Sequence, residues 1–130
     1  MKILFICQGN MVRSQIAEVL YKKYKDGNVL SAGILPNAEE HDGKKLKDLD
    51  LGVWIEALKD KEGIDISLNI CKQVTKEMVR EAEMVIVMSK KEIWPDFLKN
   101  RKDIISWDDV EDNGDIPKVI DQIKGRVIPL

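Results

Sequence analysis

The chain contains few of the residues that mark an extracellular or metal-dependent protein. Its 130 residues include only two cysteines and one histidine. The cysteines, Cys7 and Cys71, are widely separated in sequence and form no disulfide framework. A single histidine leaves no metal-ligand spacing. Because no export signal is evident either, we expect a protein of the reducing cytoplasm that needs no metal and no cofactor.

An excess of charge of one sign is also lacking, and so are long apolar runs. The 21 basic and 23 acidic residues give a net charge of -2, and no block of Lys and Arg stands out. This balance argues against a general attraction to nucleic acid or to an anionic membrane. No apolar run approaches the length of a membrane span, and no charged region precedes an apolar N-terminal stretch. The length predicts a single domain over residues 1–130.

What the sequence does contain is an alternation of apolar strands and amphipathic helices. Buried strands are expected at 2–6 and 84–88, where apolar side chains follow one another without interruption, and shorter strands at 29–31 and 104–106. Helices are expected at 14–25, from 44 to Gly63 with a possible break at Gly52, at 75–82, at 90–99, and at 115–124 with Gly125 as the cap. This order predicts an α/β fold with a parallel sheet and helices on both faces.

The most informative segment directly follows the first strand and reads Cys7-Gln8-Gly9-Asn10-Met11-Val12-Arg13-Ser14. A loop of this length can direct its backbone N–H groups at one tetrahedral oxyanion, with a helix N-terminus beneath it. Arg13 can bind two oxygens of that anion with its planar guanidinium. The same positive field favours the thiolate form of Cys7. The arrangement suits displacement at phosphorus through a cysteinyl-phosphate intermediate, although a buried structural thiol is the simpler alternative for Cys7.

This loop and the following Gln15-Ile16-Ala17-Glu18 resemble the Cys-x5-Arg-Ser loop of the low-molecular-weight protein tyrosine phosphatases. Four further segments resemble the family in the right order: Ser31-Ala32-Gly33, Gly63-Ile64-Asp65-Ile66-Ser67, Lys72-Gln73-Val74-Thr75, and Glu83-Met84-Val85-Ile86-Val87-Met88. Each fragment alone is weak, but five in order are strong. The resemblance implies a three-layer α/β/α domain over residues 1–130 with a four-stranded parallel sheet in the order 2-1-3-4. It also implies a cysteine-dependent phosphatase.

The resemblance also assigns roles within the site. It makes Cys7 the nucleophile and Arg13 the phosphate clamp, and the residues expected to bind phosphate or support the loop are Gln8, Gly9, Asn10, Met11, Val12, Ser14 and Ser31. Asn10 tolerates a left-handed backbone, and Ser31 is expected to steady it. Ser14 can donate a hydrogen bond to the Cys7 thiolate. Ser14 also suits a plain helix N-cap, and both roles can hold together.

A proton donor for the leaving oxygen is the least certain part of the predicted site. The chemistry needs one, because expelling an unprotonated alkoxide or phenolate is costly. In the family this donor is an Asp followed by Pro late in the chain. Asp112 fits best here, because Val110-Glu111-Asp112 aligns with the residues leading to that Asp, but Asn113 replaces the Pro. Asp108, Asp109 and Asp115 remain alternatives, as does a solvated acidic loop without a catalytic role.

The expected substrate is a phosphorylated protein or a small phosphate ester, with inorganic phosphate or a similar oxyanion as product or inhibitor. Met11 stands where tyrosine-directed members of the family carry an apolar residue. Gln8, and the absence of an aromatic residue after Asp112, weaken the case for phosphotyrosine. Trp54 is equally compatible with a pocket wall and with core packing.

Two other functions remain open at this point. Thioredoxin-coupled arsenate reductases share the fold, and their loop resembles Arg13-Ser14-Gln15 more closely than the phosphatase loop does. Their mechanism needs two further cysteines after the strand that ends at Met88, where this sequence has none, and Cys71 is better explained as a core thiol. The second alternative is a module that binds or carries phosphate without hydrolysing its esters.

Overall fold

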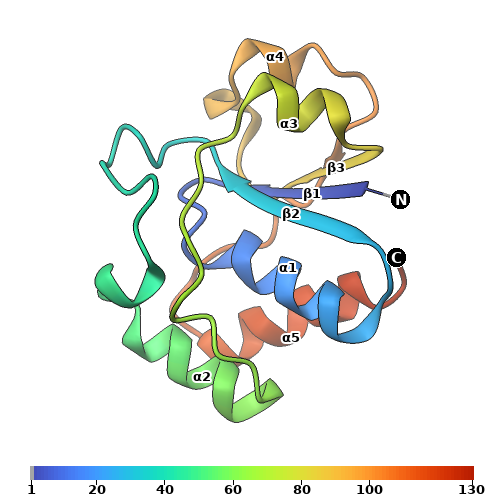
Figure 1. The fold of residues 1–130 in the computed structure, drawn as a ribbon. Helices are drawn as coiled ribbons and strands as arrows, with labels where there is room; N and C mark the ends of the chain where they lie inside the picture. Colours follow the sequence, from blue (N-terminus) through green and yellow to red (C-terminus); the bar gives the residue numbers. More distant parts are fainter. Residues whose placement is uncertain (1) are drawn as a thin grey trace.

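A four-stranded parallel sheet forms the middle layer of the protein (Figure 1). The computed structural model describes residues 2–130. Its strands are β1 (Lys2–Cys7), β2 (Asn28–Gly33), β3 (Met84–Val87) and β4 (Ile105–Ser106), in the order β2-β1-β3-β4. All three neighbouring pairs are parallel. The predicted fold class and strand order are therefore confirmed.

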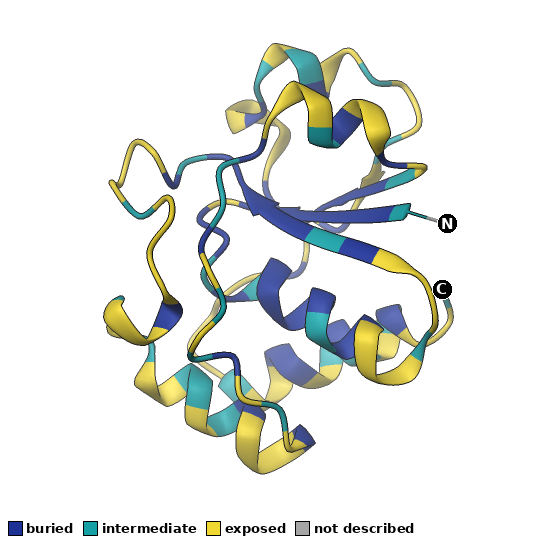
Figure 2. Ribbon diagram, in the orientation of Figure 1, coloured by how far each residue is buried: buried dark blue, intermediate teal, exposed yellow. Residues whose placement is uncertain are grey.

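Helices cover both faces of this sheet. One face carries α1 (Arg13–Tyr24), α2 (Gly52–Glu62) and α5 (Ile116–Val127), and the other carries α3 (Lys76–Glu81) and α4 (Asp96–Lys99) (Figure 1). Two short 3-10 turns, Leu46–Asp48 and Lys91–Ile93, precede α2 and α4. The central strands are buried along nearly their whole length, whereas the outer helices are buried on one side only (Figure 2).

The side chains of β1 point alternately into two separate cores, as the period of a strand requires. Phe5 packs with the helices α1 and α5, and Ile6 packs with α3 and α4. Because both faces are covered, β1 and β3 can be apolar at every position, which explains the uninterrupted runs in the sequence. The two cores fix the carboxyl edge of the sheet, where β1 ends at Cys7.

Three helix predictions are wrong in detail. The segment predicted as a helix from 44 to Gly63 starts instead with a 3-10 turn and Asp50 at a left-handed φ of 56°, while the possible break at Gly52 agrees with the start of α2. The segment 90–99 does not form one helix, because Pro95 stands at the N-cap of α4 and α4 starts only after it. Finally, α5 continues through Gly125 to Val127, whose complete burial favours another helical turn.

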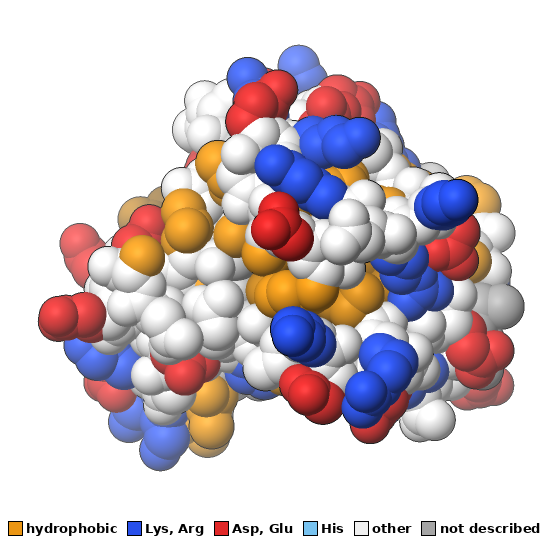
Figure 3. Space-filling model, turned by 90° about the horizontal axis from the view of Figure 1, so that it is seen from above, with side chains coloured by type: hydrophobic (Ala, Val, Ile, Leu, Met, Phe, Trp, Pro, Cys, Tyr) orange, Lys and Arg blue, Asp and Glu red, His pale blue; other side chains and the backbone are white. Residues whose placement is uncertain are grey.

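The face formed by α3 and α4 is hollowed between the two helices. Seen from above, apolar side chains lie in this hollow with Lys and Arg side chains around it (Figure 3). The hollow, a groove of about 460 Å³, is lined by Lys76, Val79, Arg80, Phe97, Asn100 and Arg101. It lies on the opposite side of the sheet from α1. Among residues 2–130, no helix is both long enough and apolar enough to cross a membrane.

Candidate active site

The loop that starts at Cys7 lies at the carboxyl edge of the sheet, where parallel sheets bind their ligands. In the sheet register, Cys7 at the end of β1 pairs with Gly33 at the end of β2. Gly33 has to be a glycine at this position, because a Cβ atom would lie 2.6 Å from the backbone nitrogen of Asn10 and 2.7 Å from the carbonyl carbon of Gly9. The second strand thus supports the loop by direct backbone contact.

The thiol of Cys7 is almost completely buried and faces two hydrogen-bonding groups. Its residue is 2% exposed. The backbone N–H of Asn10 donates to Sγ over 3.3 Å, and the hydroxyl of Ser14 shares a hydrogen bond of 3.0 Å with the same sulfur. Two hydrogen-bonding groups are thus directed at this sulfur.

Asn10 holds the loop in shape through its side chain. Its backbone has a left-handed φ of 52°, which asparagine adopts more readily than most residues. Its amide nitrogen donates to Ser14 over 2.8 Å and to Ser31 over 3.0 Å. Its amide oxygen accepts hydrogen bonds from the backbone of Lys72 at 2.7 Å and from Gln15 at 3.0 Å. The expected meeting of Asn10, Ser14 and Ser31 is thus present.

Gln15 is a further support that sequence reasoning missed. Its side chain is fully buried and donates to the backbone oxygens of Asn10 at 3.2 Å and of Ile70 at 3.0 Å. Its own oxygen accepts a hydrogen bond of 3.3 Å from Asn69. Asn69 therefore joins the loop network through Gln15. A glutamine on the buried side of a helix was the available signal, since buried amides need partners.

Cys71 lies beneath the phosphate loop as part of its support. It is fully buried, and its thiol donates a hydrogen bond of 2.9 Å to the carbonyl of Gly9. Burial raises the pKa of the Cys71 thiol to about 11, and the nearby sulfur of Cys7 adds to this shift. A thiol with such a pKa stays protonated at neutral pH and is a poor nucleophile.

The N-terminus of α1 is open towards the loop. Val12 is the N-cap residue, and no side chain caps the helix. Ser14 lies inside the first turn, so the alternative of Ser14 as the N-cap is wrong. The first N–H groups of α1 have no partners within the helix and carry its positive dipole end. This end of the helix is thus suited to an oxyanion held by the loop.

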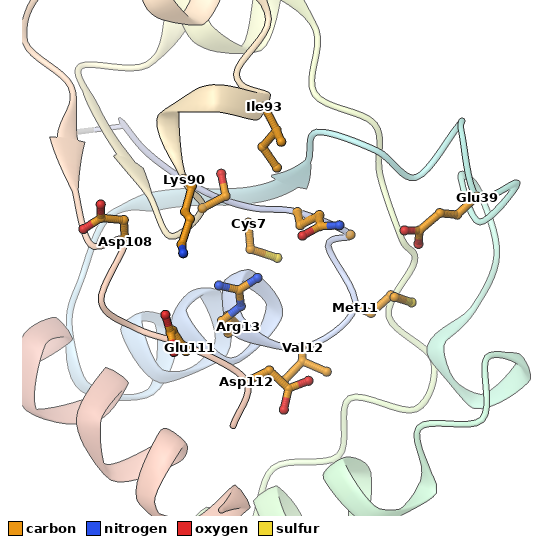
Figure 4. Close-up of a pocket in the computed structure, with 13 residues that line it drawn as sticks. Cys7, Met11, Val12, Arg13, Glu39, Lys90, Ile93, Asp108, Glu111 and Asp112 are labelled. Atoms are coloured by element: carbon orange, nitrogen blue, oxygen red, sulfur yellow. The ribbon is translucent and has the colours of Figure 1, made fainter. Parts of the chain in front are cut away.

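Arg13 projects from the first turn of α1 towards the thiol of Cys7 (Figure 4). One nitrogen of its guanidinium donates to two backbone carbonyls, those of Met88 after β3 and of Val110, the latter at 2.9 Å. These bonds fix the plane of the guanidinium. They also connect the guanidinium to the segment that carries the candidate acids. Because only one nitrogen makes these bonds, the other N–H groups of the guanidinium remain available for an oxyanion.

That acidic segment is anchored firmly up to Val110. Trp107 donates its backbone N–H to Val87 over 2.8 Å, and Val110 is completely buried. Asp109 turns outward to Arg126, with one bond of 2.7 Å, and this contact lowers the pKa of the Asp109 carboxyl. Asp115 caps α5 by accepting from the backbone of Lys118 at 3.3 Å. Two of the alternative acids, Asp109 and Asp115, are thus occupied elsewhere.

The remaining acids face a cavity of about 510 Å³ that we call the Cys7 cavity (Figure 4). It is lined by Cys7, Gln8, Gly9, Met11, Val12, Arg13, Glu39, Ser89, Lys90, Ile93, Asp108, Glu111 and Asp112. Asp108, Glu111 and Asp112 therefore share this cavity with Cys7. Of the three, Glu111 was not considered as a proton donor from the sequence. Trp54 is absent from this lining and packs against the core instead. In the described part of the chain, no aromatic residue lines the cavity.

Four other lining residues were not predicted, namely Glu39, Ser89, Lys90 and Ile93. Ser89 and Lys90 directly follow β3, and their place at a strand's carboxyl end was an available signal. Glu39 comes from the connection between β2 and α2, and its carboxylate reaches the edge of the phosphate loop. A Cβ on Gly9 would lie 3.8 Å from Oε2 of Glu39, and the same oxygen lies 3.3 Å from Nδ1 of His41. Nothing in the sequence indicated this approach.

Comparisons with known proteins agree with this geometry. A family model described as low molecular weight phosphotyrosine protein phosphatase matches residues 2–117. A low molecular weight protein-tyrosine-phosphatase of Acinetobacter johnsonii is 30% identical over 106 residues, which are 76% of this chain and 68% of that protein. A protein-arginine-phosphatase of Bacillus subtilis (strain 168) is 34% identical over 95 residues, 68% of this chain but only 56% of that protein.

The chain is also similar to the solved structure of an arsenate reductase. The thioredoxin-dependent arsenate reductase of Corynebacterium glutamicum superposes with a TM-score of 0.66 at 30% identity, over 97% of this chain and 57% of that one. A buried cysteine at the start of a loop at the carboxyl edge of a parallel sheet is typical of cysteine-dependent α/β enzymes. Within that class, the chain belongs to the low molecular weight phosphotyrosine protein phosphatase family, cysteine-dependent phosphatases that act on phosphorylated proteins.

Proposed function

We propose that this chain hydrolyses phosphate monoesters through a cysteinyl-phosphate intermediate on Cys7, and that phosphotyrosyl proteins are its substrates. One observation carries the proposal: Sγ of Cys7 is 3.3 Å from the N–H of Asn10 and 3.0 Å from the hydroxyl of Ser14, in a cavity that also contains the guanidinium of Arg13. A thiolate with two donors beside an anion cradle is the arrangement that nucleophilic displacement at phosphorus requires.

The first step is attack of the Cys7 thiolate on phosphorus, with the bond to the ester oxygen breaking in line. The backbone N–H groups from Gln8 to Val12 and the guanidinium of Arg13 bind the three equatorial oxygens, where negative charge concentrates. The leaving oxygen takes a proton from the general acid. The S–P bond formed in this step keeps the phosphoryl group on the enzyme.

The second step is hydrolysis of that S–P bond. Water attacks phosphorus, and the carboxylate left by the first step takes its proton. Cys7 departs as a thiolate, which the hydroxyl of Ser14 stabilises at 3.0 Å. The product is inorganic phosphate, and the same cradle makes phosphate and similar oxyanions competitive inhibitors.

Asp112 is the general acid of this proposal. It lines the Cys7 cavity, and the segment around it is fastened on both sides, by Val110 bound to Arg13 and by Asp115 at the start of α5. These two fastenings replace the rigidity that a proline at Asn113 would give. Asp108 and Glu111 compete for the role, because they line the same cavity.

The leaving group separates these possibilities. Asp112→Asn should reduce the hydrolysis of alkyl phosphates by about a hundredfold or more, and that of an aryl phosphate with an acidic phenol far less, because such a phenol leaves without protonation. Asp108→Asn and Glu111→Gln are the matched variants. A larger loss of alkyl phosphate turnover in Glu111→Gln would assign the acid to Glu111. A wild-type protein that binds vanadate but hydrolyses no aryl phosphate would be a phosphate-binding or carrier module.

The side walls of the cavity support an aryl phosphate as the substrate. Met11, Val12 and Ile93 offer apolar surface around Cys7 (Figure 4). A phenyl ring buries more apolar area against such walls than an aliphatic side chain of similar length. The relatives include both a tyrosine and an arginine phosphatase, so a phosphoarginine peptide is the necessary comparison in any assay.

The cysteines support hydrolysis over arsenate reduction. A reductase of the thioredoxin-coupled type needs resolving thiols beyond the first cysteine. The sequence has only Cys71 in addition to Cys7, and the thiol of Cys71 is buried, bonded to Gly9 and protonated at neutral pH. We also place the working enzyme in the cytoplasm, because neither cysteine is committed to a disulfide.

A further inference from the structure

Acidic side chains surround the mouth of the Cys7 cavity. Glu39 lies on one side of Cys7, Asp108 and Glu111 lie on the opposite side, and Asp112 lies beside Val12 (Figure 4). They come from two segments far apart in sequence, the connection after β2 and the segment after β4. These four acidic residues stand on different sides of the opening, and we call them the acidic ring; a substrate has to pass near them.

The charge of this ring is poorly balanced from within the protein. Asp108, Glu111 and Asp112 form no ion pair with any residue of 2–130, and Glu39 has only His41 as a partner. The neighbouring Asp109, by contrast, is paired with Arg126 and turned away from the cavity. Unpaired like charges repel each other across a cavity, and an incoming cation relieves that repulsion.

Two cations line the cavity, and one of them is already in use. Arg13 is held by Met88 and Val110 and faces the phosphoryl position. Lys90 extends towards the same space (Figure 4) and forms no ion pair within the described residues. Around a bound phosphoryl group, four carboxylates therefore face one free ammonium, and the field at the mouth is negative.

The cavity wall also contains a hydroxyl without a partner. Ser89 is only 4% exposed, and its Oγ forms no hydrogen bond with any other residue of the described chain. A buried hydroxyl without a partner is costly, and such groups commonly serve a ligand. Ser89 therefore marks this wall as a contact surface for the part of the substrate next to the phosphoryl group, independently of the acidic ring.

We infer that the substrate is a phosphorylated protein segment with Lys or Arg side chains next to the phosphorylated residue. This inference rests on the proposed function and specifies its substrate class. The loop and Arg13 bind the phosphoryl group, while the flanking cations pair with Glu39, Asp108 and Glu111 at the mouth. Charge complementarity of this kind acts mainly on the rate of productive encounter and on the rejection of wrong partners. Acidic segments are repelled by the same ring.

Two phosphotyrosyl peptides that differ only in their flanking residues test the inference. One has Lys on both sides of the phosphotyrosine, and the other has Glu. We expect the Lys peptide to have a kcat/KM about tenfold higher at low salt, and the ratio to shrink when salt screens the charges. A ratio at or below one, or a ratio independent of salt, would overturn the inference.

Variants of the ring make the test specific. Glu39→Gln and Asp108→Asn should each lower the Lys/Glu ratio by about twofold to fourfold, as expected for exposed charge pairs. Lys90→Gln should raise the ratio, because it removes the opposing cation. Glu40→Gln is the matched control, since Glu40 is exposed and does not line the cavity, and it should leave the ratio unchanged. Equal ratios in all four variants would contradict the role of the ring.

A small aryl phosphate separates failure of this inference from failure of the proposed function. Turnover of that compound without discrimination between the peptides overturns the inference alone. If turnover is absent altogether, binding of both peptides to Cys7→Ser still tests the ring, with tighter binding of the Lys peptide as the expected result. A phosphoarginine peptide with neutral flanks that is hydrolysed faster than the Lys-flanked phosphotyrosine would overturn the phosphotyrosyl part of the proposed function, and not the role of the ring.

Discussion

The guanidinium of Arg13 donates a hydrogen bond of 2.9 Å to the backbone carbonyl of Val110, two residues before Asp112. The phosphate clamp and the acidic segment are thus joined by direct contact, although they are almost a hundred residues apart in sequence. A phosphoryl group that orients Arg13 therefore also acts on the segment that contains Asp112, the proposed proton donor. This coupling gives the first prediction.

Arg13→Lys should impair both the binding of the oxyanion and the contact with the carbonyls of Met88 and Val110. A lysine cannot hold an oxyanion with two parallel bonds while it also binds two carbonyls. We expect kcat/KM for an aryl phosphate to fall by about a hundredfold or more. The backbone N–H of Val110, which donates to Trp107 over 3.1 Å, should exchange with solvent faster. Unchanged exchange at Val110 would show that the acidic segment is held without Arg13.

Ser14 and Ser31 should differ in their effect on catalysis although both bind Asn10. Only Ser14 contacts the sulfur of Cys7. Ser14→Ala should slow the departure of the thiolate by about tenfold to a hundredfold, the weight of a hydrogen bond to a charged group. Phosphoenzyme should then accumulate during turnover. Ser31→Ala is the control, and it should bind phosphate more weakly without accumulating phosphoenzyme. Quenched-flow mass spectrometry measures the amount of phosphoenzyme in each variant. Similar accumulation in both variants would argue against the role of Ser14.

Substitution by Ala should have opposite effects at Gly33 and at Gly125. An added Cβ at Gly33 would overlap the backbone at Asn10, whereas at Gly125 it would meet nothing within 4 Å. Gly33→Ala should displace the phosphate loop and reduce turnover by about a hundredfold. Gly125→Ala lies inside α5 and should stabilise the protein by about 0.5–1 kcal/mol without a change in activity. Thermal unfolding and aryl phosphate hydrolysis measure both, and full activity in Gly33→Ala would show that the loop tolerates the shift.

Glu62 should make the stability of the protein depend on pH in the acid range. Burial disfavours its carboxylate, but hydrogen bonds from Lys124, Tyr24 and Lys23 outweigh burial and lower the pKa of Glu62 below its usual 4.5. A lowered pKa stabilises the folded state above the usual value. This stabilisation is lost as the pH falls through the folded-state pKa.

Glu62→Gln removes that contribution. We expect the variant to be less stable by about 1–2 kcal/mol near neutral pH, because charged hydrogen bonds are replaced by neutral ones. The difference from the wild type should close as the pH falls below 4. Urea denaturation across pH measures it. A difference that is constant from neutral to acid pH would mean that the carboxylate's charge has no part in the stabilisation.

The phosphate loop was predictable because its residues are contiguous. Eight residues from Cys7 to Ser14 make up the loop between a strand and a helix, and Ser31, Gly33 and Cys71 support it from other parts of the chain. The alternation of buried strands and helices likewise predicted the parallel sheet, whereas the order of its strands was implied by the resemblance to the family. The extent of α5 was not predictable from Gly125, because the burial of Ile123 and Val127 on either side of it outweighs the cost of one glycine in a helix.

The rim of the site could not be predicted in the same way. Glu39, Ser89 and Glu111 come from three different connections, and their approach to Cys7 depends on contacts made only in the folded chain. Trp54, which the sequence left open between a pocket wall and core packing, packs against the core. Local sequence therefore determines the anion cradle, whereas tertiary packing determines which side chains stand around it.

The central claim is the covalent intermediate on Cys7, and one measurement tests it most directly. Wild-type protein is mixed with an aryl phosphate, quenched with acid within the first turnover, digested and analysed by mass spectrometry. The account predicts one phosphoryl group on the peptide that contains Cys7, and neither the adduct nor turnover in Cys7→Ser. Turnover that persists in Cys7→Ser, or a phosphoryl group found on another residue, would contradict it.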